Sequence, residues 1–381
     1  MAGDGTLVFA ALAGGGKTSI EAYRGTTRAW QVELPGTGGT LATAGGLVYA
    51  VIARSGAPLR GEPGAELHAL DATTGAERWQ LPVDATRWSV ITALAASRDG
   101  VIAGGSFAGT LRASDKVVAS AGDSDGFVAW VGLHGDVRWL VRVGGPGADQ
   151  VTGVAVSPNR IAIAGTFTAG ADLLGQVLPP FDERSANADA FVAELDAAGA
   201  RSWAATLGSK ANDVVAGVAI DSRERVAVGA TVRDVVHVGS ADLVAQGAAD
   251  GLVAWLSPEG EKGPAQLIGG LDFDGLAAVC AVDDRVVVGG FFSGRMNLAG
   301  RQMSAGGGDD AFLAAIDERG EIVAGWQVGG DGREEITGLS PIPGGFVAGV
   351  AHTANVRIDD VTLPAPADPM TGAAIVVRGV P

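Results

Sequence analysis

The chain has 381 residues, with 60 glycines, 47% hydrophobic residues, 18% charged residues and a formal net charge of -16. The negative charge argues against a nucleic-acid partner and against docking on anionic lipid, because both require a basic patch and none is visible. The single cysteine, Cys280, excludes an internal disulfide and any multi-cysteine metal site, and no apolar run reaches the ~18 residues that span a bilayer.

The first predicted elements surround the stretch "TLVFAALAGGGKT" at residues 6–18, which partly matches the sequence motif of a phosphate-binding loop. Such a loop needs a helix directly after Lys17 and Thr18, on whose N-terminus the phosphates would lie. The residues that follow alternate with a period of two instead, and Gly25 interrupts any helix. A second copy of the pattern, "LVYAVIARSG", has no Lys-Thr. The sequence therefore predicts a hairpin of two antiparallel strands joined by a glycine turn.

Further along the chain, one segment recurs. Four copies are evident: "DGFVAWVGLHGDVRWLVRVGG", "DAFVAELDAAGARSWAATLGS", "DGLVAWLSPEGEKGPAQLIGG" and "DAFLAAIDERGEIVAGWQVGG". Weaker copies extend the series in both directions. The anchor residues of all seven copies, at spacings of 47, 60, 64, 61, 60 and 63 residues, are Ile20, Leu67, Phe127, Phe191, Leu252, Phe312 and Ile375. A repeat of this length indicates a propeller or solenoid.

Each complete repeat contains four predicted strands, here called a to d. We therefore predict an all-β fold: one domain, a seven-bladed β-propeller of four-stranded antiparallel blades with incomplete first and last blades. The approximate blade boundaries are 1–36, 37–84, 85–145, 146–209, 210–270, 271–330 and 331–381. The tryptophan that recurs in the fourth strand and the aspartates that open the first and third strands are interpreted as residues of blade packing and turn geometry.

The repeats resemble the SBBP-type seven-bladed propeller repeats of bacterial secreted and envelope proteins. The segments that carry the resemblance are "GGFFSGRMNLAGRQMSAGGGDDAFLAAIDERGE" and "AGTFTAGADLLGQ…ADAFVAELDAAGARSW", and related patterns cover residues 90–350. One early repeat, "HALDATTGAERW", is similar instead to the repeats of pyrroloquinoline-quinone propellers, although the adjacent cysteine pair of that family is missing. The resemblance implies an extracytoplasmic location: periplasmic, envelope or secreted. Because "MAGDGTLVFAALAGGGK" lacks the basic start of a signal peptide, a cytoplasmic location is the alternative.

The connections between strands differ in length on the two faces of the predicted propeller. The a–b and c–d connections are short, whereas the b–c connections are long and different in every blade. The b–c connections and the d–a loops lie on one face of the propeller, which we call the b–c/d–a face. Variable insertions often mark the binding face of repeat proteins. The alternative is that the b–c connections are small hairpins that cap the blades. The candidate binding residues on this face are Arg112, Lys116, Phe181, Arg184, His237, Asp272, Phe273, Asp274, Arg295, Arg301, Glu334 and Glu335.

These patterns favour a non-catalytic binding or scaffolding module for a protein or carbohydrate partner, and no residue is assigned a catalytic role. The alternative is a glycan hydrolase or lyase of the propeller type, with acids from the d–a loops at the central channel; Asp272, Asp274, Glu334 and Glu335 qualify. No cofactor or metal is expected. The acidic stretches "GDSDG" and "GGDD" lack the carboxylate spacing of a calcium loop, and the four histidines fall at unrelated repeat positions.

The two ends of the repeat series predict an open edge. Only six first strands and six fourth strands can be counted, so blades 1 and 7 are each expected to have three strands. The unpaired apolar edge at residues 373–380 is expected to contact a strand of another chain.

Overall fold

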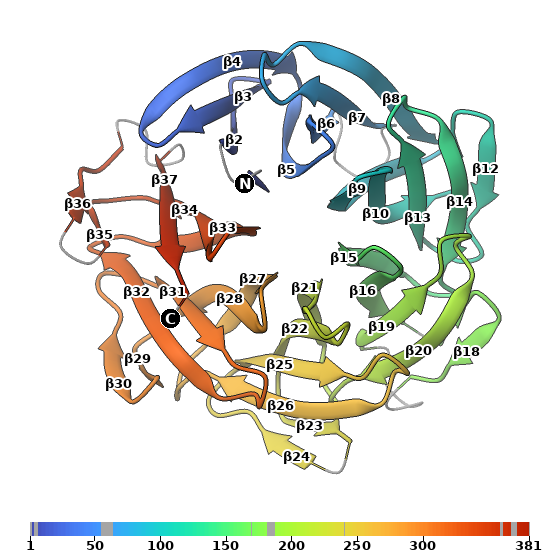
Figure 1. Ribbon diagram of the computed structural model, residues 1–381. Helices are drawn as coiled ribbons and strands as arrows, with labels where there is room; N and C mark the ends of the chain where they lie inside the picture. Colours follow the sequence, from blue (N-terminus) through green and yellow to red (C-terminus); the bar gives the residue numbers. More distant parts are fainter. Residues whose placement is uncertain are drawn as a thin grey trace. The chain divides into compact units, whose positions relative to one another are not determined.

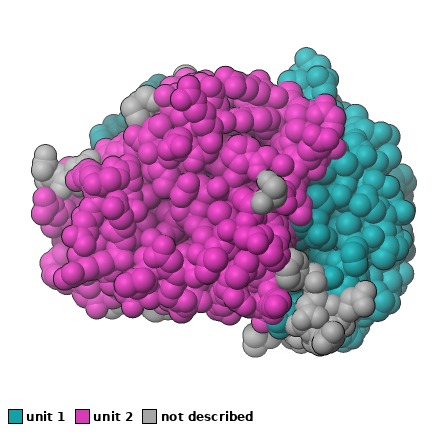
Figure 2. Space-filling view, turned by 90° about the horizontal axis from the view of Figure 1, so that it is seen from below, with its two compact units in different colours: residues 1–206 teal, residues 207–381 magenta. Residues whose placement is uncertain are grey.

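The computed structural model describes residues 2–3, 7–54, 64–168, 170–180, 187–239, 241–358, 361–366 and 372–380. These residues form strands, turns and bends, and none of them is helical (Figure 1). The strands build seven antiparallel blade sheets, which confirms the predicted all-β, seven-bladed β-propeller. The chain divides into two compact units, residues 1–206 (unit 1) and residues 207–381 (unit 2), which Figure 2 colours separately.

Unit 1 contains blades 1 to 4. Blade 1 comprises β1 (Ala2–Gly3), β2 (Val8–Gly14), β3 (Lys17–Arg24) and β4 (Thr27–Pro35). Blade 2 comprises β5 (Thr37–Ala44), β6 (Leu47–Ala53), β7 (Ala65–Asp71) and β8 (Glu77–Ala85). Blade 3 comprises β9 (Trp88–Ser97), β10 (Gly100–Ala108), β13 (Asp125–Gly132) and β14 (Val137–Val143). Blade 4 comprises β15 (Gln150–Val156), β16 (Ile161–Phe167), β19 (Asp189–Leu195) and β20 (Arg201–Leu207).

Unit 2 contains blades 5 to 7. Blade 5 comprises β21 (Val214–Ile220), β22 (Val226–Val232), β25 (Asp250–Leu256) and β26 (Lys262–Ile268). Blade 6 comprises β27 (Gly275–Val282), β28 (Arg285–Phe292), β31 (Asp310–Ile316) and β32 (Ile322–Gly330). Blade 7 comprises β33 (Glu334–Ile342), β34 (Gly345–His352) and β37 (Gly372–Gly379).

The first and last blades differ in how incomplete they are. Blade 7 has the three strands expected from the sequence. Blade 1 was expected to have three as well, but the two-residue β1 pairs antiparallel with β2, with Ala2 opposite Phe9. The expectation of three strands in blade 1 is therefore wrong, because the short strand β1 is a fourth. The sequence "MAG" shows no apolar alternation from which this strand could have been predicted.

The glycine-rich stretch near the N-terminus is the turn of a hairpin, as predicted. Strands β2 and β3 pair antiparallel, with Gly14 opposite Lys17. Between them, Gly15 and Gly16 have φ angles of 60° and 77°, which glycine adopts without steric cost. Two consecutive positive φ angles are typical of the tight turns that match the twist of the paired strands. Lys17 forms an ion pair with Glu33 on the neighbouring strand.

Residues 55–63 of the blade 2 connection lie outside the described residues, whereas the long b–c connections of blades 3 to 7 form two-stranded hairpins. Their strands are β11 (Thr110–Ala113) and β12 (Lys116–Ala119), β17 (Ala171–Leu173) and β18 (Gln176–Leu178), β23 (Val235–Val238) and β24 (Ala241–Val244), β29 (Arg295–Leu298) and β30 (Arg301–Ser304), and β35 (Val356–Ile358) and β36 (Val361–Leu363). The hairpins of blades 3 and 7 pair with the fourth strand of the preceding blade, β8 and β32. Single bridges join the hairpins of blades 4 and 6 to the ends of β14 and β26 in the same way. These hairpins cover sheet edges that would otherwise expose unpaired backbone groups.

The core lies between the second and third strands of adjacent blades. Strands β19, β25 and β31 are buried at every residue, because both of their faces pack against other sheets. Glycines in the second strands allow this close approach. A Cβ atom on Gly104 would lie 2.7 Å from Cγ1 of Val151, and one on Gly289 would lie 2.9 Å from Cγ2 of Ile336. A larger residue at either position would push two blades apart.

The tryptophan of the fourth strand joins each of blades 1 to 3 to the next blade, in what we call the indole–turn contact. The indole Nε1–H of Trp30 donates to the Ala72 carbonyl at 2.9 Å, and that of Trp79 donates to the Leu133 carbonyl at 2.7 Å. Trp139 repeats the bond with the Ala197 carbonyl at 3.1 Å. Each acceptor lies in the turn after the third strand of the next blade, so the repeat position of the tryptophan reflects packing, as predicted.

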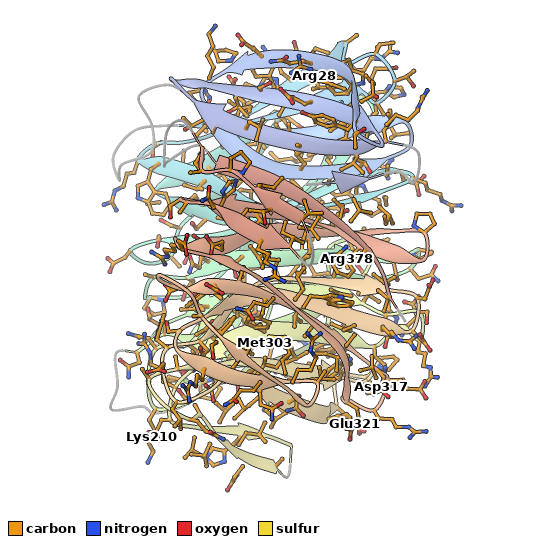
Figure 3. All side chains as sticks on the ribbon, turned by 90° about the vertical axis from the view of Figure 1, so that its left-hand side faces the viewer. Arg28, Lys210, Met303, Asp317, Glu321 and Arg378 are labelled. Carbon is orange, nitrogen blue, oxygen red and sulfur yellow. The ribbon has the colours of Figure 1, made fainter. Side chains whose placement is uncertain are left out.

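The turn on the other side of this contact explains a second repeat residue. The indoles lie against the turn glycines Gly75, Gly135 and Gly199, whose φ angles are 73°, 84° and 79°. An aspartate at the start of such a turn fixes its shape: the Asp317 carboxylate accepts the backbone N–H groups of Arg319 and Glu321, both at 2.9 Å (Figure 3). The pattern Asp-x-x-Gly recurs at the c–d turns of blades 4 and 6, and in blade 4 its glycine, Gly199, lies against Trp139.

Replacing Trp79 with phenylalanine should lower the free energy of unfolding by about 1 kcal/mol, because the Leu133 carbonyl loses its buried donor. The matched control is Trp326→Phe, since the Trp326 indole N–H has no hydrogen-bond partner among the described residues. Urea unfolding followed by circular dichroism measures both variants. Equal destabilisation by the two substitutions would contradict the stabilising role of the indole–turn contact.

Candidate functional site

Buried carboxyl groups gather on the b–c/d–a face where one blade meets the next. Within each unit they form pairs of one third-strand aspartate and the acid that precedes or opens the next blade. These buried carboxyl pairs are Asp125 with Asp149 in unit 1, and Asp250 with Asp274 and Asp310 with Glu334 in unit 2. All six side chains are at most 2% exposed. Burial of this degree gives them a structural environment unlike that of an open catalytic cleft.

The aspartates of these pairs close the loops in which they lie. Asp149 accepts the backbone N–H of Gly145 at 2.6 Å, and Asp250 accepts that of Gln246 at 2.7 Å, in each case from the residue four positions earlier. The second oxygen of Asp149 accepts the N–H of Thr168 at 3.1 Å, which ties the d–a turn to the end of β16. Charge-assisted bonds of this kind are about twice as strong as neutral ones.

The glycine at the end of each fourth strand is required by the carboxyl pairs. A Cβ atom on Gly144 would lie 2.6 Å from an oxygen of Asp149 and 2.7 Å from an oxygen of Asp125. A Cβ atom on Gly269 would lie 2.2 Å from Oδ1 of Asp250. The recurring Gly-Gly or Gly-Ser after the fourth strand therefore leaves room for two carboxyl groups.

Burial raises the pKa of every member of the three pairs. Desolvation, together with the charge of the neighbouring carboxylate, raises the pKa of Asp149 and of Asp274 to about 6, against the lowering effect of the backbone hydrogen bonds. Desolvation and the charge of Asp310 raise the pKa of Glu334 to about 7. Both Glu334 oxygens are buried, and a hydrogen bond between the carboxyl groups of Glu334 and Asp310 contributes to the raised pKa of Glu334.

The structure separates the predicted binding residues into two groups. Arg112, Lys116, His237, Arg295 and Arg301 lie on the b–c hairpins. His237 contacts Asp242 of its own hairpin, and Lys116 forms an ion pair with Asp115 at 3.0 Å. Because most of these hairpins pair with different fourth strands, their side chains are distributed over several blades.

The second group belongs to the d–a loops of unit 2. Asp274 and Glu334 are members of the buried carboxyl pairs, whereas Asp272 and Glu335 are exposed. The ring of Phe273 lies 5.5 Å from that of Phe291. Arg233, which the sequence did not single out, lies 5.8 Å over the Phe273 ring. The remaining two candidates, Phe181 and Arg184, lie outside the described residues.

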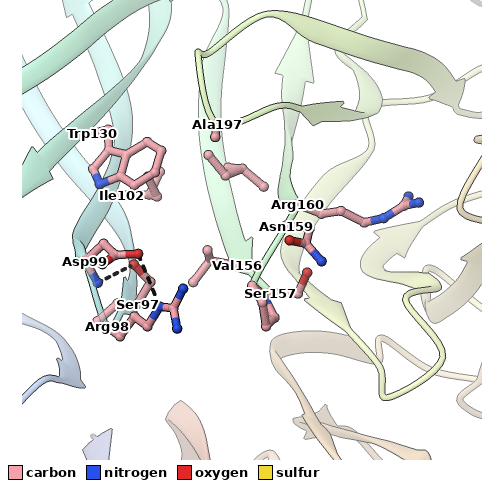
Figure 4. A pocket seen from close by; sticks show the side chains of 13 residues that line it. Ser97, Arg98, Asp99, Ile102, Trp130, Val156, Ser157, Asn159, Arg160 and Ala197 are labelled. Carbon is pink, nitrogen blue, oxygen red and sulfur yellow. Dashed lines mark hydrogen bonds and ion pairs between the residues drawn. The ribbon is translucent and has the colours of Figure 1, made fainter.

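A pocket of about 280 Å³ opens on the opposite face, between blades 3 and 4 of unit 1 (Figure 4). The a–b turns of both blades form its rim, and Trp130 of β13 forms one wall. It is lined by Ala96, Ser97, Arg98, Asp99, Ile102, Trp130, Val156, Ser157, Pro158, Asn159, Arg160, Ile161 and Ala197. The sequence analysis did not find this pocket, because it assigned these short turns a connecting role only.

The pocket combines one aromatic ring with a few polar groups. The half-buried Trp130 is held by an edge-to-face contact with Trp139 at 6.1 Å and by the Arg138 guanidinium 4.8 Å from its ring. Arg98 approaches Asp99 at 3.4 Å, and Arg160 pairs with Glu194 at 2.7 Å. The residue equivalent to Trp130 is Glu194 in blade 4, Trp255 in blade 5 and Ala315 in blade 6. Because Trp255 is buried, an aromatic residue at this repeat position does not by itself point to a pocket.

Among the described residues, no three His, Cys, Asp or Glu side chains come together in a way that would hold a metal ion. Nor do these residues include a helix with the length and hydropathy needed to cross a bilayer.

Comparison with known proteins identifies no family: no protein-family model and no curated protein matches the chain. Several solved structures are similar at a distance. The europium-containing methanol dehydrogenase matches 90% of this chain and 81% of its own, with 11% identity and a TM-score of 0.41. The Pan2 WD40 domain of Neurospora crassa matches 91% and 80%, with 9% identity and a TM-score of 0.45. KlAtg21, solved with the coiled-coil of AgAtg16, matches 96% and 96%, with 10% identity and a TM-score of 0.45. These values assign neither a family nor a function, and the resemblance to SBBP-type repeats stays a prediction.

The raised pKa values of the carboxyl pairs predict how stability depends on pH. A carboxyl group whose pKa is higher in the folded chain binds its proton more tightly there, so it favours folding while protonated. This contribution is complete below the unfolded pKa of about 4 and is lost as the pH rises through about 6 to 7. Calorimetry should therefore show a Tm that falls by a few degrees between about pH 5 and pH 8.

The Glu334→Gln variant should make this decline shallower, because the amide stays neutral throughout. Its matched control is Glu335→Gln, the next residue along β33, where the carboxylate is exposed. A slope unchanged by Glu334→Gln, or equally changed by both substitutions, would contradict the role of the pair.

Proposed function

We propose that the chain is a non-catalytic binding module that holds a carbohydrate in the pocket between blades 3 and 4. The observation that carries this proposal is the composition of that pocket, in which the half-buried ring of Trp130 stands beside polar rim residues. A sugar ring presents an apolar C–H face, which packs on an indole, and hydroxyl groups, which bind carboxylate, amide and guanidinium groups.

The rim supplies the groups that such a ligand needs. Asp99 accepts hydrogen bonds, Arg98 donates them, and the Asn159 amide can do both. The volume of about 280 Å³ is near the lower end of ligand pockets and fits one sugar residue or the end of a glycan. The pocket is half open, which suits the end of a longer chain (Figure 4).

The arrangement of acids favours binding over hydrolysis. Hydrolysis of a glycoside requires two carboxyl groups that flank the scissile bond. Asp99 is the only carboxylic acid among the described residues that line the pocket. Of the four d–a loop acids considered for catalysis, Asp274 and Glu334 are 0% exposed and engaged in the carboxyl pairs. The b–c/d–a face, with its exposed Phe273 and the neighbouring Arg233, remains the predicted surface for a protein partner.

A glycan array followed by titration calorimetry tests the carbohydrate proposal. Trp130→Ala should weaken binding of the best glycan at least about tenfold, because the stacking surface is lost, and Trp130→Phe should restore part of it. Asn159→Ala should weaken binding less, by the loss of one or two hydrogen bonds.

Arg223→Ala is the matched control, because Arg223 belongs to the equivalent a–b turn of blade 5. It should bind the glycan as the unmodified chain does. The proposal is wrong if no glycan on the array binds, or if Trp130→Ala and Arg223→Ala bind equally well.

A further inference from the structure

A recess, which we call the β32 recess, runs along the fourth strand of blade 6. Its volume is about 340 Å³, and its lining residues come from β30 of the blade 6 hairpin, from β32, and from β35 of the blade 7 hairpin. Figure 1 shows these three strands at the outer side of the blade, and Figure 3 labels Met303 of β30. All lining residues belong to unit 2, and none of them belongs to β37. They are Arg301, Gln302, Met303, Trp326, Gln327, Gly329 and Arg357.

The charge of the β32 recess is opposite to that of the chain. Arg301 and Arg357 line it, and no described lining residue is acidic, although the chain has 43 acidic residues and a net charge of -16. Arg301 is exposed and has no ion-pair partner among the described residues. Because Arg301 lies opposite Leu298, which packs on Gly325, its side chain projects from the hairpin face that packs on β32. The recess therefore presents a guanidinium group without a counter-charge.

One hydrogen-bond acceptor in the recess is held in place. The side-chain NH₂ group of Gln327 donates to the Ser304 carbonyl at 2.8 Å and to the Asp310 carboxylate at 2.6 Å. These bonds use both N–H groups, so the amide oxygen of Gln327 is directed away from them, and no described residue donates to it. The exposed amide of Gln302, on β30, can donate or accept. A ligand in the recess therefore meets both donors and acceptors.

The aromatic wall of the recess is Trp326. Its half-buried ring is held by an edge-to-face contact with Phe346 of blade 7 at 5.7 Å, and its indole N–H has no acceptor among the described residues. A sugar ring can pack its apolar C–H face on such an indole while its hydroxyl groups bind neighbouring amide and guanidinium groups. An acidic sugar additionally carries a carboxylate, which arginine binds through two parallel hydrogen bonds.

We propose that the β32 recess binds an acidic glycan built of uronic acid residues. The carboxylate of one sugar residue pairs with Arg301, its ring packs on Trp326, and one of its hydroxyl groups donates to the amide oxygen of Gln327. Arg357 strengthens the attraction for the negative charge. This ligand class rests on the proposed function, which takes the ligand of the chain to be a carbohydrate. The recess is a second site whose charge selects acidic glycans, whereas the pocket of unit 1 contains an acid beside its exposed arginine.

The test is a glycan array that carries oligosaccharides of galacturonic, glucuronic, mannuronic and guluronic acid, each beside its carboxyl-reduced neutral form. At least one acidic oligosaccharide should bind the full chain in titration calorimetry. Its neutral form should bind at least about tenfold more weakly, because the charge-assisted bond to Arg301 is lost. Raising the salt concentration from about 50 mM to about 300 mM should weaken binding of the acidic form and leave that of a neutral glycan unchanged.

Two variants and a matched control locate the site. Arg301→Gln should weaken binding of the acidic oligosaccharide about tenfold, and Trp326→Ala should weaken it to a similar extent by removing the stacking surface. Arg319→Gln removes the same charge from the c–d turn of blade 6, outside the recess, and should leave the affinity unchanged. Urea midpoints confirm that each variant is folded.

Each of four results would overturn the proposal. No acidic oligosaccharide binds, or the acidic and neutral forms bind equally well. A third result is that Trp130→Ala weakens binding of the acidic oligosaccharide and Arg301→Gln does not. The ligand then occupies the pocket of unit 1, so that the proposed function stands and this second site does not. The fourth is that a pentaglutamate peptide binds as tightly as the best acidic oligosaccharide and depends equally on Arg301, because the recess then selects negative charge and not a sugar.

Discussion

The structure depends on carboxyl groups that fix the loops between blades. A blade can pack on its neighbour only if the chain turns sharply after the fourth strand and returns to the first strand of the next blade. Asp149 imposes this turn through bonds to two backbone N–H groups, and Asp274 does the same with the N–H groups of Gly270 and Ser293. The requirement for two acids beside one chain segment explains why glycine ends the fourth strand. It also explains why burial and neighbouring charge raise the pKa of these acids.

The opposite face is organised by a different interaction, the contact of a fourth-strand indole with the next c–d turn. In blades 1 to 3 the indole N–H of the tryptophan donates a hydrogen bond in this contact, and the rest of the ring packs. In blade 5 Pro264 takes the place of the indole, with the turn glycine Gly320 against it. In blade 6 Ala324 occupies this repeat position, and Trp326, two residues further along β32, packs on Phe346 of blade 7 instead.

The hairpins change what can be concluded from the variable length of the b–c connections in this chain. Variable b–c connections predicted a single recognition face, but in blades 3, 4, 6 and 7 the hairpin pairs instead with the end of the preceding blade's fourth strand. Arg112 and Arg301 thereby lie on hairpins of different blades, in separate units. The pocket, in contrast, is formed by short a–b turns that differ little in length. Length variation marks where chain was inserted, whereas a pocket depends on which side chains adjacent blades place opposite one another.

The sequence by itself determined the blades: the repeat spacing, the period of two within each strand and the turn residues Gly15 and Gly16 are local features, and local features specify strands and hairpins. It also determined that the recurring tryptophans and aspartates serve packing, because one residue type at one repeat position has one repeated environment. Only the tertiary structure decided which acids are buried, where the hairpins pair, and that Trp130, Asp99 and Asn159 share a pocket. Those facts depend on contacts between residues 30 to 60 positions apart on different blades. Because the repeat is nearly the same in each blade, sequence pattern cannot distinguish the blade that encloses a pocket from its neighbours.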